Sequence, residues 1–360
     1  MAALPRLLAR SRNRGRPLPV RLRRRNASIM LCILYVNAVG MLLAVAGILV
    51  ERVLPATFPR RWLWFAVIPI SMILPGYYRG HHMVSVLDVQ QAVQPPLGQA
   101  FGTAYLTALD PAWWARIESY DTSINRVWIT VSAVLVLWGL ANAWRVSRLV
   151  SLSRGERGDA DGSSIVDGFP VVVTDSIGPA TVGLFRSLVL VPRWVLALPR
   201  PQRQYVLRHE EEHRRSHDAR LLFVASLPLI LMPWNLAMWW QLRRLCLAVE
   251  MDCDNRVVSG LGDATAYGEL LLKVALASSR GPRLQPALLG GVGTLERRLT
   301  VLLAPTPLRH VQRFLLPALA LGLLAIVLLM PHPVLTHGSH AMTSSTTTPV
   351  PNYTSRALPR

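Results

Sequence analysis

The chain has 360 residues, of which 51% are hydrophobic, and its formal net charge at pH 7 is +19. The mean hydropathy is positive, at +0.32. These values exclude an ordinary soluble enzyme and indicate a membrane protein with two or more structural units. Nearly all of the positive charge is arginine, because Lys273 is the only lysine, and this bias suggests a GC-rich bacterial genome.

Residues 1–28 form a basic arm, with nine arginines among the first 25 residues and no acid before Glu51. The arm lacks interleaved aromatic residues and is followed at once by an apolar segment. We therefore expect it to face anionic lipid rather than nucleic acid. It does not fit a cleavable signal peptide, because the apolar run is long and has no clear cleavage site. Translation from Met30, which would remove the arm, is an alternative.

Three apolar stretches approach or exceed the length of about 20 residues that a helix needs to cross a bilayer. They are 29–50, 127–144 and 314–330. A fourth stretch, 62–75, is shorter and contains Pro69, so the sequence predicts three to four transmembrane helices. These divide into a transmembrane region at 29–148, with an external loop at about 77–125, and a last transmembrane helix at 312–331. The Thr-, Ser- and Pro-rich tail at 332–360 is predicted to be disordered.

The distribution of arginine predicts the orientation. The loop at 77–125 has few arginines and several acids, whereas 145–220 is rich in arginine. By the positive-inside rule, the first is external and the second cytoplasmic. The N-terminus lies outside if 62–75 spans the membrane and inside if it does not, and the sequence leaves both open.

A catalytic domain is predicted at 149–311. Two apolar, β-branched runs, 169–174 and 187–191, predict strands. The segment between them is a candidate edge strand that pairs with an extended substrate, with a plain structural hairpin as the alternative. Its candidate substrate-binding residues are Thr181, Val182, Gly183 and Leu184. Further on, the apolar segment 221–232 is expected to be buried or to dip into the membrane.

A zinc-peptidase pattern, H-E-x-x-H, runs from His209 to His213 in a helix predicted at 203–217. Positions i and i+4 share a helix face, so both histidines can bind one tetrahedral Zn²⁺, one ion per chain. Glu210 can then take a proton from the attacking water. Glu211 and Glu212 lie about 100° and 200° further round the helix, and we expect them to meet arginines or solvent. A solvated Glu-rich helix face is the alternative.

A second polar group, Glu250 to Asp254, lies in a helix predicted at 234–258. Glu250 and Asp254 are spaced i, i+4, so one can bind the metal while the other orients a ligand histidine. Asp252 points elsewhere, and a polar face of an amphipathic helix is the alternative. Cys253 is geometrically open as a ligand, although a small buried residue is the commoner explanation. The three cysteines form no disulfide pattern and fit reduced, cytoplasmic thiols.

With these segments in order, the chain resembles the membrane zinc metallopeptidases typified by the BlaR and MecR beta-lactam sensor-transducers, peptidase family M fifty-six. The resemblance covers roughly 170–306. It rests on Pro179 to Pro192, on Leu207 to His213 followed by Asp218, on Pro233-Trp234-Asn235, on Glu250 to Asp254, and on Leu295-Glu296-Arg297-Arg298.

The resemblance implies a mainly α membrane protein with an inserted α+β gluzincin-like zinc peptidase domain. It assigns zinc binding to His209, His213 and Glu250, the general base to Glu210 and a supporting role to Asp254. The sensor-transducers carry an external penicillin-binding domain after the last span. Only about thirty polar residues follow here, so we do not expect beta-lactam sensing.

We therefore expect a multi-pass zinc endopeptidase of the bacterial inner membrane that cleaves a protein at the cytoplasmic face. Its expected partners are membrane lipid and a substrate such as a transcriptional repressor or regulator, with no direct nucleic acid. The oxyanion donor is left open among Arg208, His217, Tyr267 and His310. An HtpX-like quality-control protease and a non-catalytic signalling scaffold are the alternatives, and an intact Glu210 argues against the second.

Overall fold

A computed structural model describes residues 29–55, 58–89, 120–155, 164–174, 178–185, 187–278, 292–303 and 310–330. All of these belong to one unit, Ser28–Pro333. The predicted basic arm at 1–28, the central part of the predicted external loop at 77–125 and the predicted tail at 332–360 lie outside the described residues.

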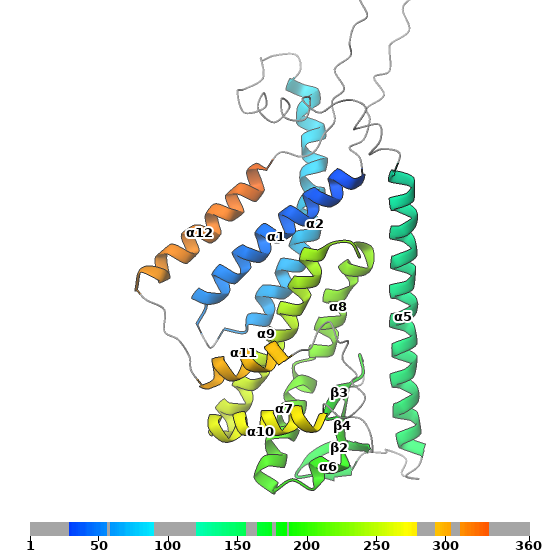
Figure 1. Cartoon of the computed structure of the whole chain (residues 1–360), viewed down its shortest axis with the longest axis vertical. Coiled ribbons are helices and arrows are strands. Elements are labelled where there is room, and N and C mark those ends of the chain that lie inside the picture. The colour runs from blue at the N-terminus through cyan, green and yellow to red at the C-terminus, as the bar shows by residue number, and fades with distance from the viewer. Residues whose placement is uncertain are drawn as a thin grey trace, which may run out of the picture. The chain divides into compact units, whose positions relative to one another are not determined.

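The described chain is mostly helical (Figure 1). It begins with α1 (Ile29–Val53), α2 (Arg60–Val89) and α5 (Asp121–Gly155). The later helices are α6 (Arg193–Leu196), α7 (Arg200–Arg215), α8 (Asp218–Leu231), α9 (Leu236–Leu261), α10 (Ala264–Ser278), α11 (Val292–Leu303) and α12 (His310–Leu329).

Three described helices are long and apolar enough to cross a membrane: Ile29–Val53, Asp121–Arg145 and Val311–Leu329. They contain the three long spans predicted from the sequence, to within one residue at the C-terminal end of the last, which confirms the prediction of a membrane protein. The shorter predicted segment, 62–75, lies inside α2, which is not among the three.

A small mixed sheet of four strands precedes α7. The strands are β1 (Ser164–Val166), β2 (Phe169–Thr174), β3 (Ala180–Val182) and β4 (Leu188–Pro192), in the order β1-β2-β4-β3. The two strands predicted from the sequence, β2 and β4, pair parallel, with Val172 opposite Leu190. Strand β3 pairs antiparallel with β4, with Thr181 opposite Val189. The predicted edge strand is therefore present, and it is also one arm of a hairpin.

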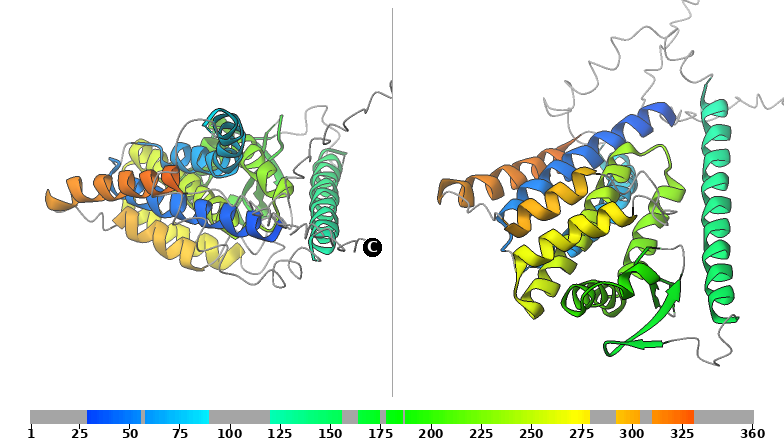
Figure 2. Two further views of the ribbon diagram at one scale, coloured as in Figure 1. Left: turned by 90° about the horizontal axis from the view of Figure 1, so that it is seen from above. Right: turned by 60° about the horizontal axis from the view of Figure 1, so that its bottom comes forward.

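Two hydrophobic clusters meet along α9. The first packs α1, α2 and α8 against the first half of α9, through residues such as Val39, Trp64, Leu229 and Leu245. The second joins the sheet, α7 and α10 to the last turns of α9, through residues such as Val191, Leu207, Tyr267 and Val257. Figure 2 shows α10 and α11, in yellow and orange, side by side over this second cluster. Glu250 and Asp254 lie where one cluster gives way to the other.

Local signals in the sequence fix the ends of the helices that carry the site. Helix α7 starts with Pro201 in its first turn, where the missing N–H costs nothing. After α7, His217 adopts a left-handed backbone with φ of 54° and turns the chain into α8. Asn235 caps α9 by accepting a hydrogen bond from the Met238 N–H, with an O–N distance of 3.1 Å. The turn at His217 brings the first residue of α8, Asp218, back beside α7.

Candidate metal and catalytic site

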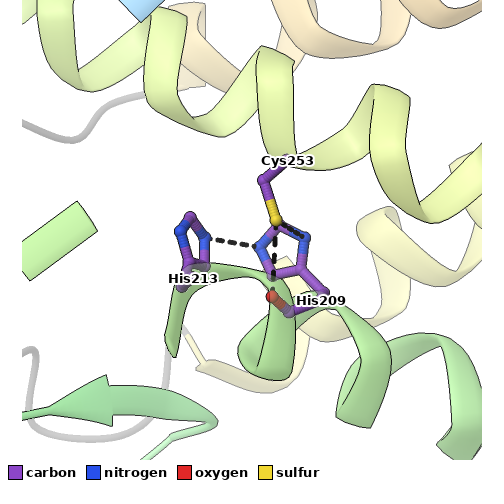
Figure 3. Close-up of side chains that lie close together, drawn as sticks. All are labelled: His209, His213 and Cys253. Atoms are coloured by element: carbon purple, nitrogen blue, oxygen red, sulfur yellow. Dashed lines mark hydrogen bonds between the residues drawn. The ribbon is translucent and has the colours of Figure 1, made fainter. Parts of the chain in front are cut away.

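The two histidines of the H-E-x-x-H pattern lie one turn apart on α7 and face each other (Figure 3). Their Nε2 atoms are 3.2 Å apart. Two nitrogens bound to one tetrahedral zinc ion, each at about 2.0–2.1 Å, would be about 3.3 Å apart. The spacing predicted from the sequence therefore produces the geometry that a shared metal ion requires.

Asp218 holds the far side of the His213 ring. Its Oδ2 lies 2.8 Å from His213 Nδ1, and a carboxylate can only accept there, so Nδ1 carries the proton. The lone pair of Nε2 is then free for a metal. Asp218 is only 2% exposed, and Arg61 Nη1 lies 2.8 Å from its Oδ1.

A longer chain of hydrogen bonds holds His209. The Tyr267 hydroxyl donates to Asp254 Oδ1 at 2.7 Å and lies 2.9 Å from His209 Nδ1. Because the phenol has one proton, its oxygen accepts from His209 Nδ1–H, which again leaves Nε2 free. Arg298 in turn donates to both Asp254 oxygens at 2.7 Å. Burial, and then the nearby Asp254, raise the pKa of Tyr267, so the phenol keeps its proton.

Glu250 presents its carboxylate to both Nε2 atoms. Its Oε2 is 3.6 Å from His209 Nε2, and its Oε1 is 3.8 Å from His213 Nε2. Burial raises its pKa, but Arg298, whose Nη1 is 2.9 Å from Oε2, and the two histidines outweigh burial and lower it. The carboxylate is therefore ionised, and each of its two oxygens faces one Nε2 atom.

Cys253 offers a second way to complete the set. His209, His213 and Cys253 have ligand atoms within 4.8 Å of one another. However, the Cys253 Sγ lies 3.4 Å from His209 Nδ1 and 3.3 Å from the His209 carbonyl oxygen. It thus approaches the ring from the side that Tyr267 occupies. Because the Glu250 carboxylate faces both Nε2 atoms, we expect it to be the third ligand, and Cys253 is the alternative.

In the metal-free protein both imidazoles have raised pKa values, so a metal would bind the Nε2 atoms in exchange for their protons. Burial lowers the pKa of His209, but the neighbouring Cys253 and Glu250 outweigh it and raise that pKa to about 10. Burial also lowers the pKa of His213, but Cys253 and Asp218 outweigh it and raise that pKa well above its ordinary value. Imidazoles that hold protons this strongly sit in a negative field. Two nitrogens and a carboxylate in such a field are a donor set that fits zinc.

Glu210 lies between the metal ligands in sequence and touches the edge strand. It is 7% exposed, and the Thr181 hydroxyl on β3 lies 2.7 Å from its carbonyl oxygen and 3.1 Å from its Oε2. Glu210, the predicted general base, is therefore in contact with Thr181, which was predicted to bind substrate. Beyond them, the Leu184 carbonyl accepts from Arg220 Nε at 2.7 Å.

The other two glutamates of the pattern meet arginines, as predicted. Glu211 pairs with Arg214 and Arg215, each at 2.7 Å. Glu212 pairs with Arg208 at 2.8 Å and with Arg256 at 3.1 Å. These contacts confirm that prediction and show that the two side chains serve packing rather than the metal site.

Three of the four residues weighed as oxyanion donors have contacts elsewhere. Tyr267 is behind His209, and Arg208 is paired with Glu212. His217 Nδ1 lies 2.9 Å from the Arg215 carbonyl oxygen, and the His310 side chain lies outside the described residues. The sequence did not reveal the supporting roles of Tyr267 and Arg298, although Arg298 lies in a segment that carried the family resemblance.

Comparison with known families identifies the family of the chain. Residues 28–302 match the family described as BlaR1 peptidase M56. The match covers more than half of the chain, so the chain belongs to this peptidase family and the resemblance drawn from its motifs is confirmed. With three candidate spans, it is a membrane-associated peptidase. No curated protein and no solved structure matched the chain.

Proposed function

We propose that the chain is a zinc-dependent endopeptidase of the bacterial inner membrane, with a gluzincin-like catalytic domain and one zinc ion per chain. The observation that carries the proposal is that two histidine nitrogens and a carboxylate lie next to one another. These are the Nε2 atoms of His209 and His213, 3.2 Å apart, and the Glu250 carboxylate that faces both.

Several residues of this chain have separate roles in the proposed amide hydrolysis. Zinc, when bound, supplies a water of lowered pKa and polarises the scissile carbonyl. Glu210 takes the proton of the attacking water and passes it to the leaving amide nitrogen. The Thr181 hydroxyl, 3.1 Å from Oε2, orients that carboxylate. Asp218 and Tyr267 keep the ligand histidines in the tautomer that can bind a metal.

An extended stretch of a protein is the proposed substrate. Strand β3 is at the edge of the described sheet, and it touches Glu210 through Thr181. A peptide that pairs with Thr181, Val182, Gly183 and Leu184 would receive backbone hydrogen bonds without a demand for particular side chains. Its scissile bond would lie beside the proposed base.

The arginine-rich segment that leads into the catalytic domain supports a site at the cytoplasmic face by the positive-inside rule. The substrate class that fits this face is a cytoplasmic regulator, such as a transcriptional repressor. Membrane lipid surrounds the candidate spans, and the enzyme needs no direct contact with nucleic acid.

A Glu210→Gln variant tests the mechanism. Glutamine keeps the size of the side chain and an oxygen for Thr181 but cannot take a proton. Wild type and variant are expressed in a bacterial host, and new protein N-termini are mapped by mass spectrometry while bound zinc is measured. Exposed Glu269 on α10 gives the control, Glu269→Gln.

We expect cleavage products that appear with wild type and with Glu269→Gln but not with Glu210→Gln, at equal zinc content. The same products from all three proteins would overturn the peptidase mechanism. Absence of zinc from the wild type would overturn the metal site.

A further inference from the structure

The first turn of α2 is tied to the helix that carries Glu250 and Asp254. Asp252 on α9 accepts hydrogen bonds from the backbone N–H groups of Arg60 and Arg61, at 3.1 Å and 3.0 Å. A carboxylate in this place satisfies N–H groups that have no partner within the helix and interacts favourably with the helix dipole. Asp252, which points away from the metal ligands, thus anchors α2.

The same turn of α2 is also connected to the candidate metal ligand His213 through Asp218. Arg61 Nη1 lies 2.8 Å from Asp218 Oδ1, while Asp218 Oδ2 lies 2.8 Å from His213 Nδ1. The side chains of Arg61 and Asp218 are 13% and 3% exposed. One buried carboxylate therefore joins α2 to His213, with a separate oxygen for each partner.

The nearest competing cation does not replace Arg61. Arg256 Nη2 lies 3.9 Å from Asp218 Oδ2, the oxygen that already faces His213, and Arg256 Nε is bound to Glu212 at 3.1 Å. Among the described residues, Arg61 is the one whose side chain holds Oδ1. Removing it would free the carboxylate to rotate away from the histidine.

The turn that carries Arg61 has little freedom of its own. One turn further along α2, Trp64 is fully buried, donates to Glu51 on α1 at 3.0 Å and packs edge-on against Trp240 on α9 at 5.5 Å. A change in the packing of α2 on α1 or α9 would therefore move Arg61 as well.

We propose that Arg61 is a positioning residue for His213, and that the first turn of α2, anchored by Asp252, couples the packing of the membrane helices to the metal site. The inference rests on the proposed function, since it assumes that His213 binds zinc. Through Asp218, Arg61 fixes the orientation of the imidazole, and outer contacts of this kind typically change metal affinity or activity about 10- to 100-fold.

The test uses the full chain in detergent and measures zinc affinity by competition with a chelator, together with the absorption spectrum of the Co²⁺-loaded protein. Arg61→Gln should lower zinc affinity about 10- to 100-fold and alter the Co²⁺ spectrum. Arg61→Lys, which keeps the charge, should recover most of the affinity. Arg60→Gln is the matched control, because its side chain has no carboxylate within ion-pair distance in the described part of the chain while its backbone N–H stays bound to Asp252.

Asp252→Ala tests whether the anchoring of the first turn of α2 on α9 affects the metal site through Arg61. It should lower zinc affinity in the same direction as Arg61→Gln, and the double variant should lose little more than the worse single variant, because both changes break one connection. Fully additive losses would overturn this coupling. If Arg61→Gln fails to fold, Asp252→Ala still decides the question: wild-type affinity and spectrum in that variant would overturn the coupling through α2.

His213→Ala separates this inference from the proposed function. Equal zinc binding by wild type and His213→Ala would show that the metal site itself is wrong. A loss in His213→Ala, with wild-type affinity and spectrum in Arg61→Gln, would overturn the positioning role alone.

Discussion

Three buried or half-buried acids reach the site from two helices, and each makes a separate contact. Asp218 on α8 holds His213, Asp254 on α9 holds His209 through Tyr267, and Glu250 on α9 faces both free nitrogens. Arg298 joins the last two acids, at 2.9 Å from Glu250 and 2.7 Å from Asp254. Buried carboxylates need such partners, since an unpaired charge in this interior would be costly.

The third metal ligand can be decided by two substitutions on α9. Glu250→Gln should lower zinc affinity by more than the roughly 100-fold seen for outer contacts, because it removes the charged ligand atom. Cys253→Ala should change zinc affinity by less than about 10-fold, below the range of outer contacts, with some loss of thermal stability since the thiol is fully buried. Chelator competition on both purified variants measures the difference. A large loss in Cys253→Ala with wild-type affinity in Glu250→Gln would assign the ligand to Cys253.

The sequence predicted the contacts between residues that are close together in the chain. It missed the contacts between distant residues that come together only when the helices pack. The i, i+4 spacing placed His209 beside His213, and the same spacing placed Glu250 and Asp254 on one face of α9. Tyr267 reaches His209 across 58 positions, and Arg61 reaches Asp218 across 157. No period or short motif encodes such contacts, because they depend on how helices pack.

At the scale of elements, the positions of the helices were easier to predict than the pairing of the strands. The helices predicted at 203–217 and 234–258 correspond to α7 and α9, which begin and end within three residues of the predicted ranges. Strand β3 has three residues, too few to show alternation, so its insertion beside β4 and the parallel pairing of β2 with β4 could not be derived. The edge position that matters for substrate is a property of the whole sheet.

Helices α1 and α9 approach closely at Gly40. A Cβ at this position would lie 2.9 Å from the Ala237 Cβ, which has no flexible end to move away. The Gly40 carbonyl also accepts from Gln241 Nε2 at 2.8 Å. Small residues allow such contacts between helices in membranes, so Gly40 is needed for the packing that carries α9 and its acids.

Gly40→Ala should therefore destabilise the protein, by about 1–3 kcal/mol as is typical of overpacking. Thermal unfolding of the detergent-solubilised chain measures the effect as a lowered Tm. Gly139→Ala on α5 is the control, since a Cβ there meets nothing within 4 Å, and it should leave Tm unchanged or slightly raised. Equal Tm values for Gly40→Ala and wild type would contradict the close approach.

At the scale of the whole molecule, contacts between helix ends define two sides. The first residue of α1 donates its N–H to Asp121 at the start of α5, at 3.2 Å, so these helices begin on the same side. At its other end, α1 places Glu51 against Arg244 on α9, and α2 begins beside the metal site. If α1 and α5 both cross toward the metal site, the chain between them must cross back. Under that condition α2 would supply the return crossing, which is our prediction for segment 62–75, although α2 is not among the three helices that length and composition identify as candidate spans.

The two sides can be told apart by labelling introduced cysteines with a membrane-impermeant maleimide in spheroplasts. Tyr120, 58% exposed at the start of α5, and Phe58, 39% exposed before α2, mark opposite sides. The wild type is the control, because its own cysteines are buried or half-buried. Although the arginines of residues 1–28 favour the opposite orientation, the arginine-rich segment 145–220 leads into the catalytic domain, so we expect from the positive-inside rule that the side of the metal site is cytoplasmic. Tyr120→Cys should then react in intact spheroplasts, and Phe58→Cys only after permeabilisation. Labelling of Phe58→Cys from outside would place the metal site on the external face and exclude a cytoplasmic substrate.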